Sequence, residues 1–198
     1  MKSLCGILLI VLIACQGVHA GTKDPNEPND PALLMRAKWD IVITILRNKE
    51  LNQETRENKI NQIVNSIFDF PLMAKLALGR EHWPKLSPAQ REKFTQLFIE
   101  RLKTSYREKI ALYTGEKVEF KPAVRKKDLI QIPMELISKD KKVTIIHKLR
   151  KADKLWKIYD VDIQGVSILL TYRSQFDDIL RRGTVEDLLS RLEKPPTE

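Results

Sequence analysis

The sequence has few cysteines and few long apolar runs. Only Cys5 and Cys15 are present, so the chain beyond them offers no disulfide, thiolate metal site or cysteine nucleophile. The one long apolar run, Leu4 to Ala14, is roughly 11 residues, whereas a membrane-spanning helix needs about 20. We therefore expect a domain that is stabilised by a packed core and is not integral to a membrane.

Catalytic and metal-binding patterns are also missing. His82 and His147 lie far apart and have no histidine or carboxylate neighbours at ligand spacing. The Gly165-Val166-Ser167 segment lacks the second glycine of a nucleophile elbow, and seven glycines in the whole chain provide no phosphate-binding loop. The sequence therefore predicts no catalytic residue, no metal site and no cofactor.

The first 31 residues have the pattern of an exported protein. Lys2, the short apolar run and Val18-His19-Ala20 predict a signal peptide over residues 1–20. Residues 21–31, rich in Pro, Asn and Asp, predict a linker. Leu12-Ile13-Ala14-Cys15 also resembles a lipobox, so release as a soluble protein and membrane anchoring through a lipidated Cys15 both stay open.

The net charge is +9, which suits nucleic acid, an anionic membrane or an acidic partner. Export argues against nucleic acid. The basic residues also alternate with acidic ones, as in Arg91-Glu92-Lys93, a pattern typical of a solvated helix face. Attraction to an anionic membrane or partner is the alternative interpretation of this charge.

The hydrophobic period divides the chain into helices, strands and helices. Apolar residues at helical spacing predict helices at 33–46, 60–68, 72–78, 88–114, 166–183 and 185–192. Ser87-Pro88-Ala89-Gln90 predicts a capping box, Gly79 a helix stop, and Thr184 the cap of the last helix.

Between Gly115 and Gly165 the period changes to 2, with short polar turns. This predicts a curved antiparallel meander of about four strands, with Pro133 at an edge or a bulge. The fold class is therefore α+β, with N-terminal and C-terminal helices packed on one face of the sheet. We expect one domain over residues 32–193 and a disordered tail over 194–198.

The segment from Trp156 to Phe176 resembles the signature of the MlaC (toluene-tolerance) family. It contains a tryptophan on the last long strand, Gly165-Val166-Ser167, Tyr172-Arg173, and a phenylalanine three residues further on. Further resemblances are Phe68-Asp69-Phe70 with Met73 and Leu78-Gly79, Trp83 before Leu86-Ser87-Pro88, and the Phe94-Leu97-Phe98 stripe leading to Tyr106. The resemblance covers about residues 32–193.

The resemblance implies a periplasmic, monomeric carrier of phospholipid. Such a carrier would exchange lipid between an outer-membrane lipoprotein–porin complex and an inner-membrane ABC transporter with an MCE-domain subunit, and so maintain outer-membrane lipid asymmetry. The acyl chains would occupy an apolar cavity enclosed by the sheet and the helices. The residues expected to contact lipid are Phe94, Leu97, Phe98, Leu102, Tyr106, Phe120, Ile130, Ile132, Met134, Ile145, Trp156, Ile158, Leu169 and Phe176. Arg173, Arg181 and Arg182 are candidates for the phosphate or for partner docking.

Two other functions stay open at this point. A periplasmic interaction module without a ligand would have a fully packed interior. An exported enzyme acting on a small apolar substrate would need a polar pair deep in a cavity, such as Asp160 with Tyr106 or Tyr172.

Overall fold

The computed structural model describes residues 30–111, 115–139 and 141–194, with the backbone alone for 106–111. The predicted signal peptide, residues 21–29 of the predicted linker and the last four residues lie outside this range. Residues 30 and 31 of the predicted linker instead form the cap and the first position of α1. The elements that precede the sheet are α1 (Pro31–Arg47), α2 (Gln53–Ile67), α3 (Phe70–His82), a short 3-10 helix (Trp83–Lys85) and α4 (Pro88–Ala111). Two helices follow the sheet, α5 (Ile168–Arg182) and α6 (Val185–Glu193).

Side-chain caps begin the helices where the sequence predicts them. The Ser87 hydroxyl accepts a hydrogen bond from the Gln90 amide at 3.2 Å, and the Gln90 side chain accepts one from the Ser87 amide at 2.8 Å. Thr184 and Asp187 form a second capping box at the start of α6. These caps satisfy backbone donors that the first helical turn leaves without partners.

Gly79 interrupts α3 where the sequence predicts a stop, but the chain resumes a helical course as far as His82. Its backbone angles are φ 71° and ψ −176°, a region that residues with a Cβ rarely adopt. The helix also starts two residues earlier than predicted, because the Asp69 side chain accepts a hydrogen bond from the Leu72 amide.

The sheet is open and antiparallel, and it confirms the predicted meander with two short strands added. Its strands are β1 (Lys117–Phe120), β2 (Val124–Lys126), β3 (Leu129–Ile137), β4 (Lys142–Ala152), β5 (Leu155–Ile163) and β6 (Val166–Ser167). The spatial order is β1-β3-β4-β5-β6, and β2 pairs with the same side of β3 as β1 does. The predicted helix at residue 166 therefore begins two residues later, after β6.

Pro133 lies in β3, which is an interior strand. Its carbonyl accepts a hydrogen bond from the Lys121 amide at 2.9 Å, where β1 ends. Because both backbone groups of a residue in such a strand point to the same neighbour, the missing donor of Pro133 faces the gap between β1 and β2. The interruption of the partner strand, and neither an edge strand nor a bulge in β3, accommodates the proline.

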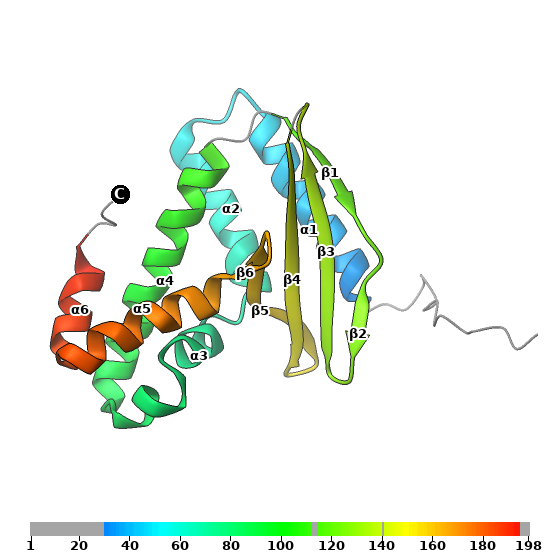
Figure 1. Ribbon diagram of the computed structural model, residues 1–198. Coiled ribbons are helices and arrows are strands. Elements are labelled where there is room, and N and C mark those ends of the chain that lie inside the picture. The colour runs from blue at the N-terminus through cyan, green and yellow to red at the C-terminus, as the bar shows by residue number, and fades with distance from the viewer. Residues whose placement is uncertain (1–29, 112–114, 140, 195–198) are drawn as a thin grey trace, which may run out of the picture.

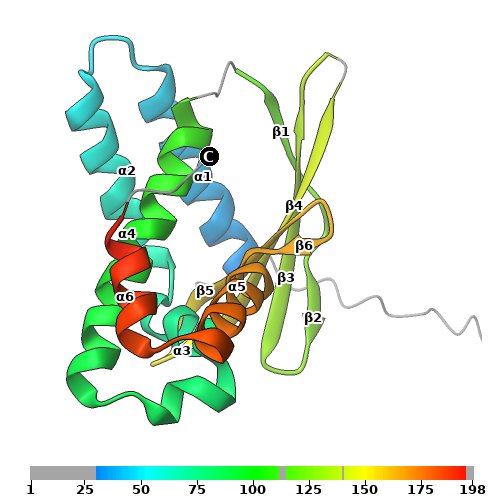
Figure 2. The same cartoon turned by 60° about the vertical axis from the view of Figure 1, so that its left-hand side comes forward.

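The helices cover one face of the sheet (Figures 1 and 2). Helix α1 packs on this face through Met35, whereas α2, α3 and α5 contact β5 directly. Two clusters of buried side chains result. The first, which we call the helical core, joins α3, α4, α5 and α6 around Phe94, Phe98 and Phe176. The second, the sheet core, joins Met35 of α1 to Ile132 and Trp156 of the sheet. None of the described helices is both long enough and apolar enough to cross a membrane.

Candidate functional site

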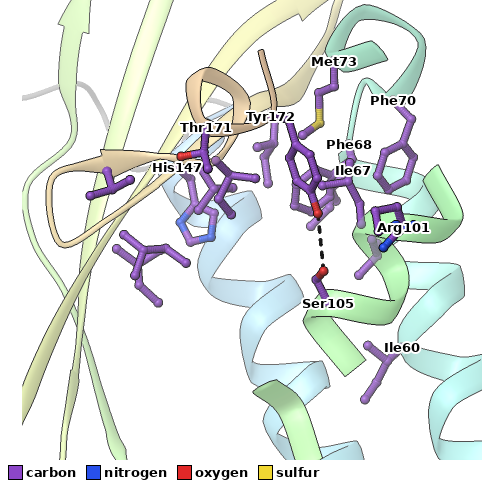
Figure 3. Close-up of a pocket in the computed structure, with 18 of the residues that line it drawn as sticks. Ile60, Ile67, Phe68, Phe70, Met73, Arg101, Ser105, His147, Thr171 and Tyr172 are labelled. Carbon is purple, nitrogen blue, oxygen red and sulfur yellow. Dashed lines mark hydrogen bonds between the residues drawn. The ribbon is translucent and has the colours of Figure 1, made fainter. Parts of the chain in front are cut away.

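A cavity of about 1230 Å³ separates the helical core from the sheet core (Figure 3). Phe70, Met73 and Phe176 of the helical core line one part of its wall. Met35, Ile67, Ile158 and Val161 of the sheet core line another. The apolar residues that complete the wall come mainly from α1, α2, α5, α6 and β4. The interior is therefore not fully packed, and the space has the size and lining of a site for an apolar ligand.

The structure divides the fourteen predicted lipid-contacting residues among four places. Those on the cavity wall are Leu102, Ile145, Ile158 and Phe176. Those within or against the helical core, away from the wall, are Phe94, Leu97, Phe98 and Leu169. Those within or against the sheet core, also away from the wall, are Phe120, Ile130, Ile132 and Trp156. Met134 is fully buried and does not line the cavity, and the Tyr106 side chain lies outside the described part of the structure. Contact of any of them with lipid stays a prediction.

The position of helix α1 explains why several of the predicted residues on the sheet do not line the cavity. It lies over the half of the sheet that carries Ile130 and Trp156 and so separates these side chains from the cavity. On β3 and β4 the cavity reaches the sheet toward the other end, at residues such as Val143 and Ile145. On β5 it extends as far as Ile158, which lies in the same cross-strand row as Ile130.

Our sequence reasoning did not assign α1 and α2 to the wall. They contribute Trp39, Val42, Leu46, Ile60, Ile63, Val64 and Ile67. One indication was available, because α1 carries large apolar residues around most of its circumference and such a helix contacts neighbours on more than one side.

The cavity wall includes a few polar side chains. The Tyr172 hydroxyl lies 3.4 Å from the Ser105 hydroxyl, and the Tyr172 ring packs edge-on against Phe98 (Figure 3). His147 is only 7% exposed, and its Nδ1 has no hydrogen-bond partner among the described residues. Burial lowers the pKa of His147 to about 4, against an opposing effect of the Ile132 backbone. The ring is therefore neutral at neutral pH and compatible with an apolar interior.

Cations also border the cavity, at Lys38, Arg101, Arg191 and Lys194. The Arg101 guanidinium donates hydrogen bonds to the carbonyls of Arg191 and Lys194, at 2.9 and 2.6 Å, and so fixes the end of α6. The arginines that the sequence suggested for a phosphate do not line the cavity. Arg173 donates to the Leu76 carbonyl, and Arg181 and Arg182 pair with Asp178 on α5.

Asp160 faces away from the cavity. Ile158 and Val161 both line it, and a bulge in the pairing of β4 with β5 keeps these two on one face and turns Asp160 to the other. The Asp160 carboxylate accepts hydrogen bonds from the Ser167 hydroxyl at 2.8 Å and the Leu169 amide at 3.2 Å. It also pairs with Lys148 at 2.9 Å. Burial lowers the pKa of Lys148, but the hydrogen bond and charge of Asp160 outweigh this effect and leave the pKa above its usual value.

A second polar cluster joins α3 to α5, outside the cavity. His82 Nε2 lies 2.9 Å from Asp177 Oδ1, and one ligand atom each of Glu81, His82 and Asp177 lie within 4.8 Å of one another. The spacing of these residues in the sequence gave no indication that Asp177 lies beside Glu81 and His82. The hydrogen bond from His82 holds the pKa of Asp177 below its usual range. Lys85 pairs with Glu81 at 3.6 Å and Arg181 with Asp177 at 3.3 Å, and these cations compete with any metal ion for the carboxylates.

These features define an α+β domain with one helical layer on an open sheet and an apolar cavity between two cores. The model of the MlaC protein family matches residues 36–194, and the chain belongs to this family. The chain is similar to the intermembrane phospholipid transport system binding protein MlaC of Haemophilus influenzae, with 25% identity over 187 residues that cover 89% of this chain and 87% of the relative. It is also similar in fold to a phospholipid-binding protein from Ralstonia solanacearum, solved in complex with a phospholipid. That match has a TM-score of 0.71 and 24% identity, and it covers 83% of this chain and 95% of the other.

Proposed function

We propose that the chain is a periplasmic phospholipid carrier that holds the acyl chains of its cargo in the cavity between the two cores. The observation that carries this proposal is the 1230 Å³ apolar cavity in a member of the MlaC family. The similar proteins from Haemophilus influenzae and Ralstonia solanacearum are described as phospholipid transport and phospholipid-binding proteins, which supports the same cargo here. The cations at Lys38, Arg191 and Lys194 are positioned to interact with the phosphate of a headgroup.

The energetics fit a reversible carrier. Each methylene group removed from water contributes about 0.8 kcal/mol, so two acyl chains contribute more than roughly 20 kcal/mol against water. That exceeds the practical limit of non-covalent affinity. The lipid, however, exchanges with a bilayer or another carrier in which the chains are already out of water. The net free energy of transfer is then near zero, as exchange in both directions requires.

The exchange partners we propose are an inner-membrane ABC transporter with an MCE-domain subunit and an outer-membrane lipoprotein–porin complex. A monomer that moves lipid between them would maintain the lipid asymmetry of the outer membrane. The cavity argues against a ligand-free interaction module, whose interior would be packed. The orientation of Asp160 removes it from the polar pairs that an enzyme on this fold would place inside the cavity.

Native mass spectrometry of the protein purified from its own periplasm tests this function, with lipid extraction to identify any added mass. We expect an adduct of the mass of one phospholipid per chain. A chain that carries no adduct, and that acquires none on incubation with phospholipid vesicles, would contradict the proposal.

A further inference from the structure

One end of the sheet concentrates exposed cations. The β2–β3 and β4–β5 turns lie together at the lower end of the sheet in Figure 1. We call this end the tip face. Its cations are Arg125, Lys126, Lys127, Arg150, Lys151 and Lys154, and its only acidic residues are Asp128 and Asp153, in the two turns.

The strand register places cations on both faces of the sheet. Lys126 pairs with Leu129, and Leu129 pairs with Arg150, so these three side chains form one row on the face away from the helices. On the other face, Arg125 and Lys151 both lie over the ring of Trp156, at 5.4 and 5.5 Å from its centre. Trp156 is 6% exposed and belongs to the sheet core, so it holds these two cations in place.

The charges of the tip face are not neutralised. Within the described residues, none of its cations lies within ion-pair distance of a carboxylate. Three of the lysines nearer the opposite end differ in this respect. Lys117 pairs with Glu119 at 2.7 Å, and Lys121 and Lys142 pair with Glu135 at 2.8 and 2.7 Å.

Exposed aliphatic side chains lie among these cations. Val124 is 56% exposed, Leu129 is 40% exposed and Leu155 is 57% exposed. They are single residues separated by cations, and the one aromatic ring at this end is buried. Protein interfaces are instead enriched in accessible aromatic residues and depleted in lysine. Scattered aliphatic residues among lysines suit the boundary between lipid headgroups and acyl chains.

From this arrangement we infer that the tip face docks the protein on the surface of an anionic phospholipid bilayer. The cations attract the negative headgroups, and Val124, Leu129 and Leu155 contact the headgroup boundary. No residue of the tip face lines the cavity, so docking leaves the cavity wall unchanged. Helix α1 starts at this same end, where Ala32 packs against the cluster that contains Trp156. The first described residues therefore lie beside the docking face.

Flotation with phospholipid vesicles tests the inference. Every protein is exported from a precursor that carries Cys15→Ser, so that no acyl anchor contributes. The vesicles are phosphatidylcholine alone, or phosphatidylcholine mixed with phosphatidylglycerol. The tip variant carries Lys126→Glu, Arg150→Glu and Lys154→Glu. The matched control carries Lys117→Glu, Lys139→Glu and Lys141→Glu, which change the net charge equally at the other end of the sheet.

We expect the parent chain to bind the anionic vesicles, to lose binding as salt rises, and not to bind phosphatidylcholine alone. The tip variant should bind at least about tenfold more weakly, because it replaces three cations that an anionic surface attracts with carboxylates that it repels. The control should change less than about threefold, and Leu155→Ser should weaken binding without a change in charge. Equal loss in both triple variants, or no binding by the parent, would overturn the inference. So would a tip variant that binds vesicles normally but loses a protein partner.

Failure of this docking is distinguishable from failure of the proposed carrier function. The tip substitutions lie outside the cavity wall, so the tip variant should retain the same phospholipid adduct in native mass spectrometry. Urea unfolding of each variant establishes that the comparison concerns folded proteins.

Discussion

The Ser167 hydroxyl donates a hydrogen bond of 2.8 Å to the Asp160 carboxylate, and this contact joins the start of α5 to β5. The same carboxylate accepts from the Leu169 amide in the first turn of the helix. Asp160 therefore provides both a helix cap and the partner of Lys148. Its geometry is that of a structural residue that positions α5, which forms part of the cavity wall.

Replacing Asp160 should destabilise the fold strongly. Asp160→Ala leaves Lys148 and the Leu169 amide without their buried acceptor, and we expect a loss of about 2 to 4 kcal/mol in the free energy of unfolding. Asp162 lies 3.8 Å from Lys148, and Asp162→Ala is the control, with an expected loss below about 1 kcal/mol. Urea unfolding followed by circular dichroism measures both. Equal losses would show that the hydrogen bonds to α5 contribute little.

The kink in α3 should not tolerate a side chain. A Cβ at residue 79 would lie 3.0 Å from Arg173 Nε, in a backbone conformation that few residues with a Cβ adopt. Gly79→Ala should therefore cost about 2 to 4 kcal/mol and weaken the hydrogen bond from Arg173 to the Leu76 carbonyl. Gly165 also has a positive φ, of 82°, but a Cβ there meets open space. Gly165→Ala should cost only about 1 kcal/mol, and similar midpoints of thermal unfolding for the two variants would contradict this assignment.

The stability of the protein should fall at acidic pH because of His147. Its pKa is about 4 in the folded chain, against an ordinary value of 6.5. The unfolded chain thus binds a proton between these values when the folded chain does not, and stability decreases as the pH falls from about 6.5 to about 4. The full loss is roughly 3 kcal/mol.

The test of this pH dependence is His147→Leu, which removes the titrating group while keeping an apolar side chain. Urea unfolding at pH 7 and at pH 4.5 should show a smaller difference for the variant than for the parent. His82→Leu is the control, because its ring is bonded to Asp177 and lies outside the cavity. A pH dependence that His147→Leu leaves unchanged would place the titrating group elsewhere.

Neighbouring isoleucines of β4 should differ in their effect on lipid retention. Ile145 lines the cavity and Ile146 points to the opposite face of the strand. Ile145→Asp places a charge beside the proposed acyl chains, so we expect at least about tenfold lower phospholipid occupancy. Ile146→Asp should retain the lipid, as measured by extraction and mass spectrometry from matched amounts of folded protein. Loss of lipid from both variants, or from neither, would contradict the placement of the acyl chains.

The sequence was sufficient to predict the elements whose patterns are local. Capping residues located the starts of α4 and α6, and the change of period at Gly115 located the sheet. Strands β2 and β6 have three and two residues, too few for an alternating pattern. Pro133 was predicted to lie at an edge or a bulge, but the strand pairing that accommodates the proline depends on the partner strand.

The wall of the cavity was less predictable, because hydrophobic periodicity shows which side chains avoid water and not what they contact. Phe94, Phe98 and Leu102 lie on one stripe of α4. Phe94 and Phe98 pack against Phe176, at 5.4 and 5.8 Å between ring centres, whereas Leu102 lines the cavity. Whether a residue of this stripe lies in the core or on the cavity wall depends on the positions of α1, α5 and α6. Contacts between residues far apart in the sequence set these positions.

The division of the interior into two cores has a consequence for how the protein unfolds. Phe68 packs against both cores and its neighbour Asp69 donates a backbone hydrogen bond to the Ile158 carbonyl, so this short connection joins the two halves directly. An acyl chain in the cavity would add apolar contacts between the halves and bind only the native state. The bound lipid would then contact both halves at once, and we expect the loaded protein to unfold in a single transition. Without cargo, the helical half and the sheet half are expected to lose structure at different temperatures, so that cooperativity itself reports on the presence of lipid.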